Sequence, residues 1–249
     1  MIQLPSRIAA LLVAALLGAA AVAAPAAAGE RPPVMVELYT SQGCNSCPPA
    51  DAALGRMAAR EDLVALAFHV DYWDYLGWRD TFARPDHTER QFAYRTALRA
   101  RMVYTPQVIV QGRSHAVGSH EAEVAGLIEA AQAAQAAAMP AELALEPGRA
   151  GGGLTARLEP APGGGNAGPA RLWLAVYDRS REVDIGRGEN GGKRITYHNI
   201  VRELRALLDW DGASAEEVTV PMPPAGQGVA VWLQRAGPGA ILCVAKYES

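Results

Sequence analysis

The sequence is poor in cysteine. Its 249 residues include three, Cys44, Cys47 and Cys243. So few cysteines exclude a disulfide scaffold, and without a second C-x-x-C pair or a nearby histidine pair a tetrahedral zinc site is excluded too. We therefore expect no metal and no other cofactor. One close pair of cysteines and one distant cysteine remain to be explained.

The sequence also lacks an excess of charge of either sign. The formal net charge is −3, and the only lysines are Lys193 and Lys246. A chain without a basic field has no electrostatic means of holding a polyanion. Nucleic acid and anionic membrane surfaces are therefore not expected partners.

Long apolar runs are absent after the N-terminus, and no later stretch is apolar enough to span a bilayer. At the N-terminus, Arg7 is the only charged residue before Glu30, and a run of small apolar residues covers 8–23. Alanines 26–28 then offer a cleavage site. These are the parts of a secretory signal peptide over residues 1–28, the alternative being a retained membrane anchor. We expect a periplasmic or secreted chain, free of the membrane after cleavage, in a compartment where thiols are oxidised.

Residues 33–138 alternate between strand and helix patterns. Strands are predicted over residues 34–39, 63–70, 107–110 and 114–117, and helices over 50–60, 86–101 and 119–138. The run 63–70 is apolar almost without interruption, as in a strand that is buried on both faces. The cysteine pair falls at the first junction of strand and helix.

The pattern changes near residue 140. Beyond it the chain has seven short strand candidates separated by glycine- and proline-rich turns, which suggests a mostly β, sandwich-like domain over residues 141–249 with a helical insert at 201–208. We expect the domain over residues 29–140 and this β-rich accessory domain to fold separately and to act together.

The element order, the cysteine pair and a Thr105-Pro106 pair just before the third strand together resemble the thioredoxin superfamily. The strings at residues 37–44, 47–51, 69–74 and 104–107, with 186–190 and 197–199, are similar to an exported thioredoxin-like family catalogued as domain of unknown function 1223. The resemblance implies an α/β thioredoxin-like domain over residues 29–140 and a redox-active disulfide. It also implies that the Thr105–Pro106 bond is cis and faces the cysteines, with Thr105 offering backbone hydrogen bonds to a bound peptide.

Thiol–disulfide exchange needs a thiolate, and a helix N-terminus stabilises one through its unpaired N–H groups and partial positive charge. With Ser46 as the N-cap, Pro48 and Pro49 would occupy early helical positions, where a missing N–H matters little. Cys44 then lies just outside the helix, open to solvent, and is the predicted nucleophile. Cys47, more enclosed, is the predicted resolving thiol.

Polar residues follow the second predicted strand. His69, Asp71 and Asp74 lie at the edge where open α/β sheets place ligands, so one of them is a candidate proton acceptor for Cys47 or a modulator of Cys44. The alternative is that His69 is a satisfied core histidine and that the acids cap a loop. The aromatic residues after His69 form either a wall facing the substrate or a lid on the sheet. Asp51 is assigned no catalytic role.

Two other features are weaker. Residues 186–191 satisfy G-x-G-x-x-G, but a strand pattern follows them where a dinucleotide site needs a helix, so a hairpin loop is expected. A role for this loop and His198 beside the cysteines stays open. Cys243 lies in an apolar run and is interpreted as a small buried hydrophobic residue, the alternative being a third redox partner.

Two classes of function emerge. The first is a thiol–disulfide oxidoreductase that uses Cys44 and Cys47 on protein or small-molecule thiols and disulfides. The second is a binding module in which the Cys44–Cys47 bridge only braces the chain. A Cu(I)-handling protein is a third reading, because paired thiolates suit Cu(I), although no Met-rich or His-rich tract accompanies them.

Overall fold

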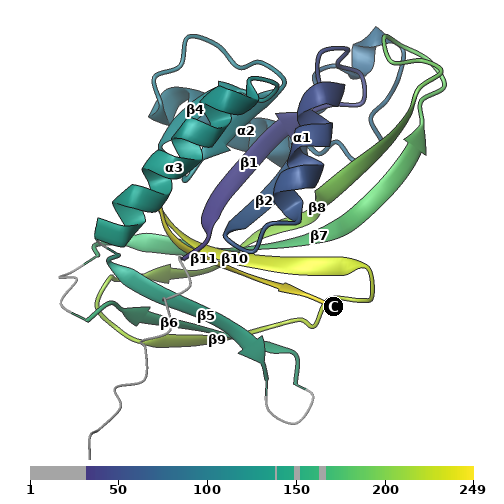
Figure 1. Ribbon diagram of the computed structural model, residues 1–249. Coiled ribbons are helices and arrows are strands. Elements are labelled where there is room, and N and C mark those ends of the chain that lie inside the picture. The colour runs from purple at the N-terminus through teal and green to yellow at the C-terminus, as the bar shows by residue number, and fades with distance from the viewer. Residues whose placement is uncertain (1–31, 138, 149–151, 163–166) are drawn as a thin grey trace, which may run out of the picture. The chain divides into compact units, whose positions relative to one another are not determined.

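The computed structural model describes residues 32–137, 139–148, 152–162 and 167–249 (Figure 1). The predicted signal peptide, residues 1–28, lies outside the described residues. The helices are α1 (Pro48–Ala58), α2 (Pro85–Ala97) and α3 (Glu121–Ala137), with a short 3-10 turn at Asp74–Leu76. The strands are β1 (Val34–Thr40), β2 (Leu63–His69), β3 (Gln107–Val110), β4 (Ser114–Val117), β5 (Ala141–Pro147), β6 (Leu154–Pro160), β7 (Ala170–Asp184), β8 (Arg194–Trp210), β9 (Glu216–Val220), β10 (Gln227–Arg235) and β11 (Ile241–Glu248). The structure is a mixed α/β fold.

An eight-stranded mixed sheet forms the centre, in the order β11-β10-β7-β8-β2-β1-β3-β4. β1 and β2 are parallel along their whole length, with Val34 beside Leu63 and Thr40 beside His69. β3 and β4 continue the sheet in the antiparallel sense on one side. On the other side β8 joins β2 through one parallel pair, Ala67 and Ile200.

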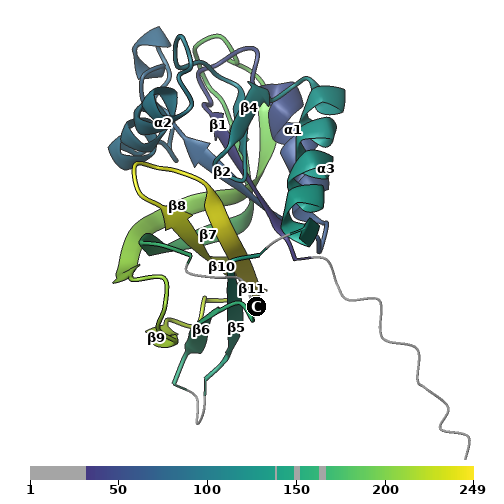
Figure 2. The same ribbon diagram turned by 90° about the vertical axis from the view of Figure 1, so that its left-hand side faces the viewer.

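Helices cover both faces of the β1–β2 region, with α1 and α3 on one face and α2 on the other (Figure 2). Successive side chains of a strand point to opposite faces, so each strand feeds two cores. Val34, Val36 and Leu38 of β1 pack with α1 and α3. Met35 and Tyr39 pack on the α2 side. β2 is apolar from Leu63 to Phe68 because both of its faces are buried, as its sequence indicated.

A smaller antiparallel sheet, in the order β5-β6-β9, lies against the part of the large sheet built by β7, β10 and β11. Leu154, Ala156 and Leu158 of β6 share a core with Leu172 and Leu174 of β7 and with residues of β10 and β11. Among the described residues the chain after Pro140 contains strands and turns and no helix. The mostly β character of this part is confirmed.

The helix predicted over residues 201–208 is wrong, because this segment is the second half of β8. Apolar residues recur there with near-helical spacing, at Val201, Leu204 and Leu207–Leu208. The register between β7 and β8 shifts at Leu172/Trp173 and again at Val176/Tyr177. Each shift adds a residue to β8 and breaks the alternation of a regular strand, so the pattern imitates a helix.

The two parts of the chain on either side of residue 140 share the large sheet. The described residues form one compact unit, and the side-chain amide of Asn199 in β8 donates a hydrogen bond of 2.9 Å to the carbonyl oxygen of Ala65 in β2. The division into two domains near residue 140 stays a prediction. Strands from both sides of residue 140 contribute to one hydrophobic core. No helix within the described ranges is long and apolar enough to cross a membrane.

Candidate functional site

Cys44 and Cys47 form a disulfide at the junction of β1 and α1, with their Cα atoms 5.4 Å apart. The N-cap of α1 is Cys47 and not Ser46, so the helix begins one residue later than predicted, with Pro48 and Pro49 in its first two positions. The carbonyl oxygen of Cys47 accepts the N–H groups of Ala50 and Asp51, at 2.9 and 3.1 Å. The bridge therefore lies at the positive end of the helix, where a thiolate is stabilised.

The two cysteines differ less in exposure than the sequence predicted. Cys47 is fully buried, but Cys44, which was expected to be open to solvent, is only 4% exposed. The turn before Cys44 is buried, and Asn45 and Ser46 occupy the exposed surface instead. The hydroxyl of Ser46 lies 3.4 Å from the sulfur of Cys44.

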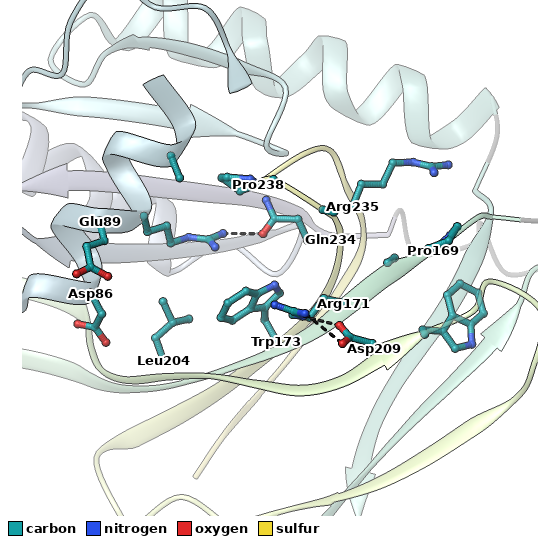
Figure 3. A pocket seen from close by; sticks show the side chains of 16 residues that line it. Asp86, Glu89, Pro169, Arg171, Trp173, Leu204, Asp209, Gln234, Arg235 and Pro238 are labelled. Atoms are coloured by element: carbon teal, nitrogen blue, oxygen red, sulfur yellow. Dashed lines mark hydrogen bonds and ion pairs between the residues drawn. The ribbon is translucent and has the colours of Figure 1, made fainter. Parts of the chain in front are cut away.

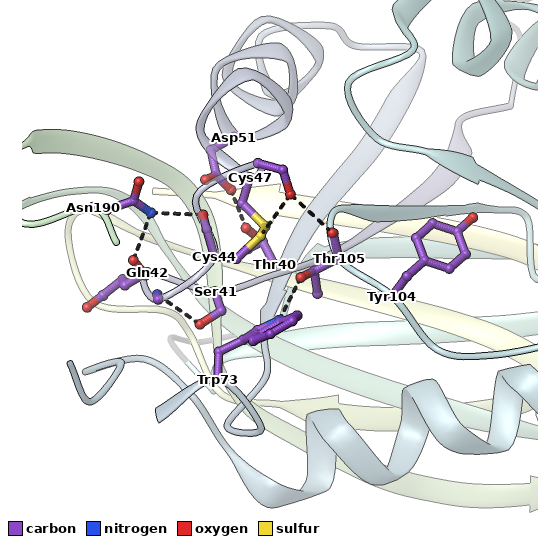
Figure 4. Close-up of a disulfide and its surroundings, with 12 residues drawn as sticks. Thr40, Ser41, Gln42, Cys44, Cys47, Asp51, Trp73, Tyr104, Thr105 and Asn190 are labelled. Carbon is purple, nitrogen blue, oxygen red and sulfur yellow. Dashed lines mark hydrogen bonds between the residues drawn. A yellow bond between two sulfur atoms is a disulfide. The ribbon is translucent and has the colours of Figure 1, made fainter. Parts of the chain in front are cut away.

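Thr105 lies beside this disulfide (Figure 4), and the Thr105–Pro106 peptide bond is cis, as predicted. The hydroxyl of Ser46 donates to the carbonyl oxygen of Thr105 at 3.5 Å. The indole N–H of Trp73 donates to the Thr105 hydroxyl at 2.8 Å, which fixes that side chain beside the cysteines. The segment before β3 and the turn before α1 therefore meet at one edge of the sheet.

A loop from the C-terminal part of the chain holds the turn before Cys44. Asn190, which is 1% exposed, donates from its amide to the carbonyl oxygens of Gln42 and Cys44 at 3.0 and 2.8 Å. Asn190 belongs to the β7–β8 hairpin, so the hairpin predicted for the G-x-G-x-x-G string is confirmed. Gly188 of this loop, with φ +74°, packs against Trp78. Trp78 in turn donates to the Gln42 side chain at 2.8 Å.

A buried polar cluster lies on the α1 side of the sheet, beneath the start of α1. Thr40 and His69 are register partners on this face, and the Thr40 hydroxyl donates to Asp51 Oδ1 at 2.7 Å. His69 Nδ1 is 2.7 Å from Asp80 Oδ2, which also accepts the backbone N–H of Gln42 at 2.7 Å. All four side chains are buried. Asp51, to which the sequence assigned no role, and Asp80 are thus part of the site.

Burial sets the protonation of this cluster. Desolvation raises the pKa of Asp51 to about 7, against the lowering effects of His69 and of the Thr40 hydrogen bond. Desolvation acts on Asp80 in the same sense, but the charge and hydrogen bond of His69 and the N–H groups of Gln42 and Phe82 outweigh it, so the pKa of Asp80 is lowered. The pKa values of two neighbouring carboxyl groups are therefore shifted in opposite directions.

The other residues singled out after the second strand are held by structural contacts. Asp71 accepts the hydroxyl of Thr88 in α2 at 2.7 Å, and Asp74 accepts the backbone N–H of Asp80 at 3.0 Å. Tyr72 donates to Gln91 at 3.1 Å. Tyr75, by contrast, is 76% exposed and stacks on Trp73. The structure brings His69 to the cluster beneath the disulfide, whereas Asp71 contacts α2.

Cys243 is a free, buried thiol in β11, and burial raises its pKa to about 12. It packs with the smaller sheet, in agreement with its interpretation as a hydrophobic residue. In the part of the chain that the structure describes, no group of three or more His, Cys, Asp or Glu side chains is placed to hold a metal ion.

A separate pocket of about 510 Å³ lies between α2 and the β7–β8–β10 part of the sheet (Figure 3). Several of its charged side chains already have partners: Arg171 pairs with Asp209, and Arg90 binds Glu37 with an Nε–Oε2 distance of 2.7 Å. Its lining contains neither cysteine nor histidine. The disulfide, with its polar cluster, is therefore the stronger candidate site.

Two solved structures are similar to this chain. The crystal structure of protein AGR_C_4864 from Agrobacterium tumefaciens is 32% identical, covers 86% of this chain and 93% of its own, and has a TM-score of 0.69. HBP35 of Porphyromonas gingivalis shares the fold, with a TM-score of 0.54 at 14% identity over 88% of this chain and 75% of its own. No curated protein matches the chain. The model of one family, described as protein of unknown function (DUF1223), matches residues 35–234, which confirms the resemblance noted in the sequence: the chain belongs to that family.

Proposed function

We propose that the protein is a thioredoxin-like thiol–disulfide oxidoreductase that acts outside the cytoplasm on protein or small-molecule thiols and disulfides. One observation carries the proposal: the Cys44–Cys47 disulfide begins a helix directly after a strand and faces Thr105–Pro106. A helix N-terminus favours the thiolate that exchange requires. A bridge that only braced the chain would need neither this position nor the neighbouring segment.

The exchange takes two steps. In the dithiol form the Cys44 thiolate attacks one sulfur of a substrate disulfide, R–S–S–R′, so that R′–S⁻ leaves and Cys44 is joined to R. Cys47 then loses its proton and attacks the sulfur of Cys44, which restores the Cys44–Cys47 bond and releases R–S⁻. Two electrons pass from the cysteine pair to the substrate. The same steps in reverse oxidise a substrate dithiol.

The exposure of the two cysteine residues supports these roles. Cys47 is fully buried at the N-cap, whereas Cys44 is 4% exposed, so we assign Cys44 as the cysteine that a substrate thiolate attacks. The carbonyl group of Thr105 lies at the same edge and is placed to accept a hydrogen bond from the backbone of a bound substrate. We infer an exported protein because the predicted signal peptide would deliver the pair to an oxidising compartment.

Single cysteine variants of the full chain test the proposal. Cys47→Ala should accumulate mixed disulfides at Cys44, because nothing remains to release them, and these adducts are read from non-reducing gels and mass spectra. Cys44→Ala is the matched control and should trap little, because Cys47 is enclosed. Both variants keep the buried thiol of Cys243, so Cys243 cannot account for a difference between them. Failure of both variants to form adducts, with wild type inert toward glutathione disulfide, would favour the bracing role.

A further inference from the structure

The pocket between α2 and the β7–β8–β10 part of the sheet has a buried arginine in its wall. Arg90 of α2 is 7% exposed, and its Cζ atom lies 5.1–5.8 Å from the ring centroids of four aromatic residues, Phe68, Tyr94, Trp173 and Trp232. A charged side chain is costly to bury unless its polar groups are paired. The partners of the Arg90 guanidinium group therefore determine what this wall can bind.

The core uses two of the three nitrogen atoms of that guanidinium group. Nε and Nη2 of Arg90 donate to the two carboxylate oxygens of Glu37 at 2.7 and 3.1 Å. Nη2 also donates to the Tyr94 hydroxyl at 3.1 Å and to Gln234 Oε1 at 2.9 Å, the contact drawn as the dashed line to Gln234 in Figure 3. No described residue accepts a hydrogen bond from Nη1, which carries two N–H donors. Nη1 is not among the fully enclosed atoms that lack a partner, so its accessible side faces the pocket that Arg90 lines.

The surrounding core has no acceptor to spare for Nη1. Both oxygens of Glu37 are engaged by the other two nitrogen atoms of Arg90. Gln234 Oε1 also accepts from the Trp232 indole at 3.3 Å, and its Nε2 donates to the Tyr94 hydroxyl at 2.7 Å, so this amide is fixed in its orientation. An acceptor that satisfies Nη1 must therefore come from within the pocket.

The pocket has the size and lining of a small-molecule site. Its volume is about 510 Å³, and sites for small ligands span about 300–1,000 Å³. Its apolar lining includes Trp173 and Leu204, which are half-buried, together with Trp210 and Pro238. An apolar body can be covered by these side chains while a polar head group reaches Arg90.

The charges beside Trp173 favour an acidic head group. Arg171 lines the same pocket, and its Cζ atom lies 6.0 Å from the Trp173 ring centroid, where Arg90 lies at 5.6 Å. Two guanidinium groups therefore flank one ring. Arg171 pairs with Asp209 at the surface, where the two side chains are 46% and 73% exposed and solvent screens the pair. A carboxylate forms charge-assisted hydrogen bonds with Arg90, which are about twice as strong as neutral ones.

The acidic residues of the lining limit the ligand to one negative charge. Asp86 and Glu89 lie beside α2 at one end of the pocket (Figure 3), and Asp86 is paired with Arg84 at 2.9 Å. Glu37 already neutralises Arg90 from its Nε edge. A dianion such as phosphate would therefore bring more negative charge than the pocket balances, whereas a carboxylate brings one.

We propose that this pocket binds a small organic monocarboxylate with an apolar body. The carboxylate accepts hydrogen bonds from Nη1 of Arg90, and the apolar body lies against Leu204 and the exposed part of Trp173. The lining shares no residue with the disulfide or its polar cluster, so the inference does not depend on the proposed redox function.

A pair of probes of the same shape tests the head group. The full-length chain in its disulfide form is titrated calorimetrically with 2-naphthoate and with 2-naphthamide, which has the same rings and no charge. The acid should bind with a Kd of about 1 mM or tighter, as expected for a ligand of its size, and the amide about tenfold more weakly. Decanoate, which carries the carboxylate on an alkyl chain, should displace 2-naphthoate. Equal affinity of acid and amide would overturn the proposal, and so would a lack of saturable binding of both acids.

Two variants locate the bound probe. Arg90→Lys keeps a positive charge for Glu37 and removes Nη1, so it should weaken 2-naphthoate about tenfold, to the affinity of the amide. Leu204→Trp leaves Arg90 in place and fills the pocket, so it should abolish binding of both probes even if Arg90→Lys fails to fold. Met222→Trp, at an exposed methionine outside the lining, is the matched control and should bind as the wild type does. Undiminished binding by a folded Leu204→Trp variant would place the probe elsewhere and overturn the proposal.

Discussion

The side-chain amide of Asn190 donates a hydrogen bond of 2.8 Å to the backbone carbonyl oxygen of Cys44, although 146 residues separate them in the chain. The same amide reaches the carbonyl oxygen of Gln42, and the Oδ1 atom of Asn190 accepts from Lys193 at 2.8 Å. The turn that carries Cys44 is therefore held by a hairpin from the far part of the sequence. A substitution in that hairpin should be felt at the disulfide.

Asn190→Ala should lower the free energy of unfolding by about 1–3 kcal/mol, because the buried carbonyl oxygen of Gln42 loses its donor and that of Cys44 keeps only the backbone N–H of Cys47. Urea unfolding of the disulfide form measures the loss. Asn45→Ala, at an exposed asparagine between the cysteines, is the matched control and should change stability by less than about 0.5 kcal/mol. Equal stability of the two variants would mean that the Asn190 amide does not stabilise the turn.

Local patterns were enough to predict the framework of the site. The strand at Val34–Thr40, the cysteine pair at its end and the two prolines that open α1 are all encoded within 16 residues. Proline tolerates the first turn of a helix, so this junction can be recognised without a structure. The position of Thr105–Pro106 beside the pair came from the family resemblance and not from any local rule.

The supporting residues could not be predicted, because their roles arise from contacts between distant segments. Asp51 differs from an exposed aspartate only in that Thr40, His69 and β8 enclose it, and nothing near it in sequence signals that burial. Its spacing of four residues from Cys47 was the one available sign. The Asn190 contact joins residues 146 apart in the chain, and the extra residues in β8 disguised that strand as a helix.

Two glycines offer opposite outcomes for the same substitution. A Cβ at Gly228 in β10 would lie 2.6 Å from Tyr177 Cε2, because the buried Tyr177 ring covers this glycine from the neighbouring strand. Gly228→Ala should therefore destabilise the fold by about 1–3 kcal/mol. Gly126 in α3 is exposed with nothing within 4 Å of its Cβ position, so Gly126→Ala should stabilise by about 0.5–1 kcal/mol through helix propensity. Thermal unfolding of both variants checks the signs, and destabilisation by Gly126→Ala would contradict the open surroundings of that residue.

The raised pKa of Asp51 predicts the direction in which the stability of the fold changes with pH. Its folded pKa of about 7 lies above the ordinary value of 3.8, so folding favours the protonated form, and the group weakens the fold as pH rises from about 4 to about 7. A difference of about three pKa units corresponds to about 4 kcal/mol. Asp51→Asn, which cannot ionise, should therefore gain up to that amount over wild type at pH 8 and almost nothing at pH 4, measured by urea unfolding of the disulfide form. The pKa of Asp178 is lowered in the fold, where the hydrogen bonds of Arg181 and Gln227 outweigh its desolvation, so Asp178→Asn should have the opposite sign and lose stability at pH 8. A gain from Asp51→Asn that is equal at both pH values would show that ionisation of Asp51 is not its cause.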